Sequence, residues 1–120
     1  MTGGFQGMRY AQSMGAPYLP TEVRKQPQIN AAVSEVVKLL APNVVRIRYD
    51  IDQDWSGDWA VFFRVLLSDE AADERNIGAV ARRVRHEISD RLDIPELGML
   101  PHFNFRSESE QANRRDPAWA

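Results

Sequence analysis

Apolar residues recur at a helical period in two segments of the chain. In residues 28–40 they fall three or four positions apart, which predicts a helix with one apolar face and Asn30 as its N-cap. A polar run over residues 69–75 predicts the entry to a second helix, whose apolar stripe extends from Ile77 to Leu92. Each helix therefore has one face suited to packing against a sheet.

Three other segments alternate between apolar and polar residues, which is typical of half-buried strands. They are Val44–Asp52, Trp59–Leu67 and Pro101–Arg106. The first two flank a turn that contains Ser56 and Gly57, so they are expected to form a hairpin.

The register of this hairpin is predicted from the residues that would face one another. Pairing Trp55 with Trp59 around a short loop matches charge with charge and apolar with apolar side chains. The facing pairs would be Asp50 with Arg64 and Ile47 with Leu67.

The predicted element order is helix, strand, strand, helix, strand. A right-handed crossover is expected to place the last strand parallel to the first and beside it. Both helices would cover one face of a small three-stranded sheet, which gives an α+β fold, a two-layer sandwich similar to half of a ferredoxin-like fold or to a KH-like arrangement. The covered face would be made by Val45, Ile47, Tyr49, Phe63, Val65, Leu67, Phe103 and Phe105.

The 120 residues suffice for one domain, which is predicted to occupy residues 29–106. Residues 1–28 are dense in glycine and proline and are expected to form a flexible leader, with a polyproline-like spacing at Pro17 and Pro20. Residues 107–120 are expected to form a polar tail. No apolar run has the length of a membrane span and no secretory signal is evident, so we expect a cytoplasmic protein without membrane contact.

Charge and cysteine content exclude several classes of function. The formal net charge is -2, without the basic excess of a DNA-binding domain, so no DNA partner is expected. The chain has no cysteine, which excludes disulfides, thiolate metal sites and a cysteine nucleophile.

The hairpin is rich in aspartate and imitates the spacing of a calcium-binding loop. However, Trp55 stands where that loop needs glycine, and Val61 stands where it needs glutamate. A structural hairpin is the favoured interpretation, with a weak cation site and a two-metal nuclease centre as alternatives. The candidate ligands are Asp50, Asp52, Asp54 and Asp58.

Other catalytic signatures are weak. His86 and His102 are the only histidines, too few for a three-histidine zinc site within one chain. No serine lies in a nucleophile elbow, and there is no glycine-rich phosphate loop. We therefore expect neither an enzyme nor a cofactor.

The uncovered back of the predicted sheet is the most informative surface. Arginines around an aromatic side chain are typical of a protein interface, including one that forms a homo-oligomer, and also of a surface that binds single-stranded RNA. The acidic net charge of the chain favours the protein interface. Trp119 in the tail is expected either to dock on the domain or to anchor a partner. The predicted binding surface comprises Arg46, Arg48, Phe62, Arg64, Leu66, His102, Asn104, Arg106 and Trp119.

Several short motifs resemble a family of small bacterial proteins. They are Asp54-Trp-Ser-Gly-Asp58, Phe62-Phe-Arg64, Leu67-Ser-Asp-Glu70, Phe103-Asn-Phe-Arg-Ser107 and Ser109-Glu-Gln111. Members of that family accompany HEPN-type helical proteins, so the resemblance implies a regulatory, antitoxin-like partner of another bacterial protein. A fainter resemblance is to the ribosome-binding factor A family, carried by the element order and by Arg85–Leu92, Pro95-Glu-Leu97, Phe103 and Phe105.

Overall fold

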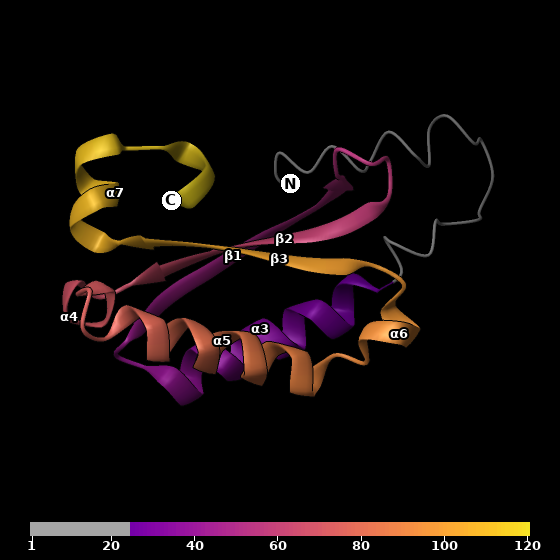
Figure 1. Ribbon diagram of the computed structural model, residues 1–120, viewed down its shortest axis with the longest axis horizontal. Helices are drawn as coiled ribbons and strands as arrows, with labels where there is room; N and C mark the ends of the chain where they lie inside the picture. The colour runs from indigo at the N-terminus through magenta and orange to yellow at the C-terminus, as the bar shows by residue number, and fades with distance from the viewer. Residues whose placement is uncertain (1–24) are drawn as a thin grey trace.

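The computed structural model describes residues 25–120, which form a three-stranded sheet with helices on both sides. Figure 1 shows α3 and α5 together on one face of the sheet and α7 on the other. The α+β class, the element order and the two-layer arrangement are as predicted from the sequence. In chain order the elements are α3 (Gln26–Leu40), β1 (Val44–Gln53), β2 (Trp59–Leu67), α4 (Asp69–Ala72), α5 (Ile77–Arg91), α6 (Ile94–Leu97), β3 (Leu100–Ser107), α7 (Glu108–Arg114) and the 3-10 helix η1 (Pro117–Trp119).

The position of the last strand differs from the prediction. The strand order is β1-β2-β3, with β2 antiparallel to β1 and parallel to β3. The predicted placement of β3 beside β1, and parallel to it, is therefore wrong. The crossover through α4, α5 and α6 joins β2 to β3 as one strand-helix-strand unit, so β3 shares the direction of β2 and lies next to it.

The hairpin register is also displaced, by two residues. Gln53 pairs with Trp59, and Arg48 rather than Asp50 lies opposite Arg64. The predicted register is wrong because the turn is longer, with Asp54 N donating to Asp58 O at 2.8 Å. A two-residue displacement leaves every side chain on its predicted face, so the alternation of the sequence does not distinguish the two registers.

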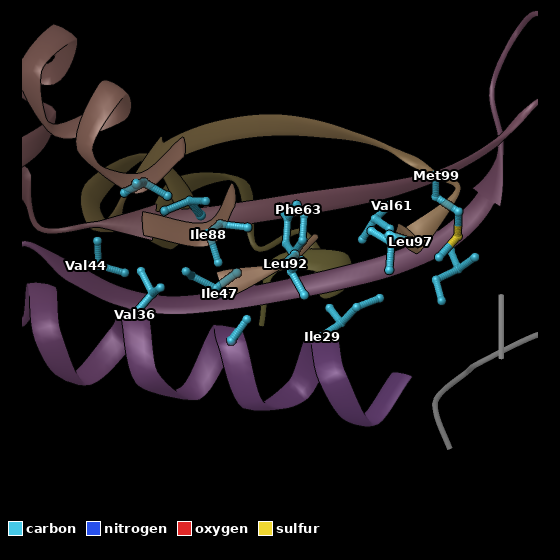
Figure 2. Close-up of a cluster of buried hydrophobic side chains, with 14 of the residues drawn as sticks. Ile29, Val36, Val44, Ile47, Val61, Phe63, Ile88, Leu92, Leu97 and Met99 are labelled. Carbon is cyan, nitrogen blue, oxygen red and sulfur yellow. The ribbon is translucent and has the colours of Figure 1, made fainter. Parts of the chain in front are cut away.

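The hydrophobic core lies between the sheet and the two long helices. Figure 2 shows its side chains between α3 and the strands. Phe63 on the central strand, Ile29 on α3 and Ile88 on α5 are all 0% exposed. A register irregularity between Val44 and Arg46 directs the side chain of Val44 into the core. Val45, the predicted core residue, is only partly buried. Strict alternation of apolar and polar residues does not predict a β-bulge of this kind, because the bulge inserts one extra residue into the strand.

Helix α3 begins earlier than predicted. Gln26 and Pro27 also belong to the helix. Pro27 is tolerated there because the N–H groups of a first helical turn have no intrahelical acceptor, so its missing N–H costs no hydrogen bond. Asn30 is not the N-cap but lies inside the helix, where its Oδ1 accepts a hydrogen bond of 2.6 Å from the Tyr49 hydroxyl. The rest of the predicted leader, including Pro17 and Pro20, lies outside the described residues.

The predicted polar tail is folded. Ser107 caps α7 by accepting from Glu110 N at 3.0 Å, and η1 follows after a left-handed turn at Arg115. Figure 1 shows this segment lying over the sheet face opposite α3 and α5. Within residues 25–120, no helix has the length and apolar character needed to cross a membrane.

Candidate binding surface on the back of the sheet

The back face, the side of the sheet opposite α3 and α5, carries the predicted binding residues in rows across the three strands. The strand pairings generate this order, because paired residues on neighbouring strands point to the same side. The rows read Arg46, Leu66, Arg106; then Arg48, Arg64, Asn104; then Asp50, Phe62, His102. The four arginines lie at one end of this face, called here the arginine end. The other end lies next to the turn that joins β1 to β2 and is called the hairpin side.

Three arginines of this end donate hydrogen bonds to three consecutive main-chain oxygens, two in η1 and one in the residue that follows it. Arg64 Nε reaches Ala118 O at 2.8 Å, an Arg46 terminal nitrogen reaches Trp119 O at 3.0 Å, and Arg48 Nε reaches Ala120 O at 2.5 Å. The guanidinium groups predicted to contact a partner are therefore engaged within the chain.

Trp119 is the anchor of this contact. Its side chain is 7% exposed, and the Arg106 guanidinium lies 4.2 Å from the centre of its ring. Arg106 also donates to Gln111 Oε1 at 2.9 Å and lies 3.6 Å from Asp116 Oδ2. The side-chain amide of Gln111 in turn donates to Asp116 O at 2.8 Å, which ties the start of η1 to α7.

Helix α7 is held in place by a contact with α4. The main-chain N–H of Ser109 donates to Asp69 Oδ1 at 3.0 Å, and its hydroxyl donates to Asp69 Oδ2. These hydrogen bonds lower the pKa of Asp69 below its ordinary value, because they favour the ionised carboxylate. The contact fixes the start of α7 independently of the arginines.

The hairpin side of the back face is aromatic and open. His102 stacks on Phe62 with ring centres 5.0 Å apart, and Trp55 lies 6.0 Å from His102. Trp55 is 88% exposed, and Leu100, two residues before His102 on β3, is 59% exposed. Trp55, Phe62 and His102 together are called the aromatic end.

The hairpin turn positions Trp55. Asp54 Oδ1 accepts hydrogen bonds from Ser56 N at 2.9 Å, Ser56 Oγ at 2.5 Å and Asp58 N at 3.2 Å. The Ser56 side chain is the main cause of a lowered pKa at Asp54, whose carboxylate is only 5% exposed. Gly57 adopts a φ of 89°, which closes the loop without strain.

A groove of about 540 Å³ lies between the two ends. The docked Trp119 and Arg114 form one wall, and Asp50, Asp52 and Phe62 form part of the other. Asn104 lies exposed in this groove. Leu66, in contrast, is 4% exposed and offers no contact surface.

The aspartates of the hairpin are not arranged as a metal site. Asp50 is paired with Arg64, Asp54 and Asp58 bond to Ser56 within the turn, and Asp52 accepts from Gln53 N at 2.7 Å. Across residues 25–120, no group of three histidine or acidic side chains converges closely enough to hold a metal ion. The hairpin aspartates therefore act locally, in the turn and in an ion pair.

Gln111 and Asp116 were missed by the sequence analysis, although they hold the segment that covers the arginine end. Two signals were available. Ser107 followed by Glu110 has the spacing of a capping box, and Asp116 before Pro117 is a common way to start a helical turn. Neither signal indicates which surface the resulting helices cover.

No protein-family model matches the chain, and no curated protein matches it either. The resemblance that the short motifs carry therefore stays a prediction.

Proposed function

We propose that the chain is a non-enzymatic protein-interaction module that binds its partner through the aromatic end of the back face. The observation that carries this proposal is Trp55, a tryptophan 88% exposed beside the stacked pair Phe62 and His102. Tryptophan is enriched among the residues that dominate binding energy at protein interfaces. An antitoxin-like or regulatory role, which the motif resemblance implies, fits such a module.

The chemistry around this cluster favours a protein partner with basic side chains. Asp52 and Asp58 are exposed beside the aromatic end, and neither forms an ion pair among the described residues. These carboxylates repel the phosphates of a nucleic acid and attract lysine or arginine at the rim of an interface. The expected partner surface is an apolar pocket that accepts Trp55, flanked by basic residues.

An RNA-binding function is the second candidate that the sequence raised. It would use Arg46, Arg48 and Arg64, whose guanidinium groups already donate to main-chain carbonyls of residues 118–120. An RNA would have to displace those contacts as well as overcome the nearby acidic residues. The arrangement therefore supports the protein partner over RNA.

The test is affinity purification from the source organism with matched variants. Trp55→Ala removes the exposed anchor, and Leu39→Ala, at a residue 47% exposed on α3, is the control. We expect one protein to be retained by the wild type and by Leu39→Ala, lost with Trp55→Ala, unaffected by nuclease and weakened by added salt. Retention that disappears on nuclease treatment, or that is indifferent to Trp55, would refute the proposal.

A further inference from the structure

Residues 116–120, called here the docked segment, lie on the arginine end as a bound peptide lies on its receptor. The sheet contacts the segment mainly through arginine N–H groups that donate to main-chain carbonyls of the segment. A single side chain, Trp119, fills the surface between them. Main-chain recognition with one side-chain anchor is how short peptide segments are commonly bound by domains.

We propose that the arginine end is a peptide-binding site, occupied in this structure by the docked segment of the same chain, and that it also accepts the docked segment of a second copy. The aromatic end, on which the proposed function rests, is a separate surface. The two proposals therefore stand or fall independently.

The tether of the docked segment permits its release. The segment joins α7 through Arg115, whose φ of 54° lies in the left-handed region that is unfavourable for a residue with a side chain. The Asp69–Ser109 contact holds the start of α7 without help from the segment. Rotation at Arg115 and Asp116 thus detaches the segment and leaves the sheet and α7 in place.

The docked segment leaves one hydrogen-bond donor of the arginine end without an acceptor. Arg46 Nε is enclosed and has no hydrogen-bond acceptor among the described residues. A buried donor without a partner is unfavourable. The same segment bound from another copy is not restrained by the geometry of Arg115, so it has the freedom to place an acceptor at this nitrogen.

The second copy is the natural alternative occupant because it carries the same residues. Every contact made within one chain is then available between two chains, so the balance between them depends on the tether, on the protein concentration and on any acceptor gained at Arg46 Nε. Reciprocal exchange of the docked segment would give a symmetric dimer, in which each copy completes the arginine end of the other. A short tether supplies an effective concentration in the millimolar range, so exchange is expected at high protein concentration.

Crosslinking between two differently labelled copies tests this proposal directly. The chain has no cysteine, so Ala120→Cys in one copy and Arg48→Cys in the other are unique attachment points. Arg48 Nε lies 2.5 Å from Ala120 O, so a bismaleimide with a spacer of about an arginine side chain's length bridges cysteines at these two positions when the segment docks. The control copy carries Leu39→Cys, which is exposed on the far side of the sheet.

We expect the pair Ala120→Cys with Arg48→Cys to crosslink several-fold faster than the pair Ala120→Cys with Leu39→Cys. Adding Trp119→Ala to the first copy should abolish this advantage, whereas adding Trp55→Ala should not. Equal rates for the two pairs, or an advantage indifferent to Trp119, would overturn the proposal. Loss of the advantage with Trp55→Ala would also overturn it, because the contact would then belong to the aromatic end.

A peptide titration provides a second measurement. The acceptor is the full chain with Trp119→Ala, and the probe is a synthetic peptide of residues 111–120. We expect NMR shifts of arginine side chains that saturate with a dissociation constant below about 1 mM, because the segment stays docked only if the millimolar effective concentration of a short tether exceeds that constant. No shifts are expected with the same peptide carrying alanine at position 119. Absence of binding to a folded acceptor would show that the segment is an integral part of the fold.

Discussion

Trp119→Ala is the substitution that most clearly separates a detachable segment from an integral one. The Trp119 side chain is 7% exposed, and removing roughly 200 Å² of its surface from water contributes about 5 kcal/mol. The contact with Arg106 adds about 1 kcal/mol. The three arginine-to-carbonyl hydrogen bonds add about 3 kcal/mol.

Ordering of the segment opposes these terms. Fixing the backbone of residues 116–120 costs about 7 kcal/mol at 1–2 kcal/mol for each residue, which leaves a net docking free energy of about 2 kcal/mol. Trp119→Ala cannot lower stability by more than this net amount, because the altered segment detaches and regains its conformational freedom. We therefore expect a loss of about 2 kcal/mol, compared with about 3–5 kcal/mol for Phe63→Ala in the core.

Urea unfolding of the wild type, Trp119→Ala and Phe63→Ala measures these differences. Trypsin provides a second readout, because Arg114 and Arg115 precede the docked segment. Cleavage there should be about 30-fold faster in Trp119→Ala, the factor that corresponds to about 2 kcal/mol when opening is rapid. A loss of about 4 kcal/mol or more would refute detachability, because it is the magnitude of removing an interior side chain.

Three further outcomes follow from local contacts. Burial raises the pKa of Tyr49 to about 12, so stability should fall as the pH rises from about 10 toward 12, and Tyr49→Phe should reduce that fall in alkaline urea titrations. Hydrogen bonds from Ser109 lower the pKa of Asp69 in the folded protein. They therefore stabilise the fold fully at a pH above the ordinary pKa of aspartate, and this stabilisation is lost as the pH falls through the lowered pKa. Asp69→Asn should remove this acid-dependent part of the stability. Gly57→Ala should cost about 1 kcal/mol in thermal unfolding, because φ is 89° although nothing obstructs a Cβ there. Little loss with Gly57→Ala would mean that the turn tolerates a side chain.

The helices and strands of the domain were predictable because their signals are local. The apolar stripe from Ile77 to Leu92 and the alternation of β1 and β2 each depend on residues within a few positions of one another. The neighbours of β3 depend instead on how a long crossover returns to the sheet, which periodicity does not encode. The two-residue displacement of the hairpin was equally hidden, since it leaves Arg64 and Phe63 on their predicted faces.

The candidate site was predictable as a set of residues but not as an arrangement. Alternation along the strands placed the four arginines on one face, and the pairings of the sheet show the same grouping. What covers them depends on contacts such as Arg46 with Trp119, which are 73 residues apart in the sequence. Such a contact leaves no periodic signature, so the sequence left open whether Trp119 docks on the domain or anchors a partner.

The rows of the back face separate the arginine end from the aromatic end along the strands. A dimer formed by exchange of the docked segment would use the arginine ends and leave both copies of Trp55 exposed. Such a dimer would be bivalent, and a partner that presents two binding sites would be held far more tightly than one that presents a single site. Protein concentration would then control how firmly the partner is retained, without any change in the contacts at Trp55.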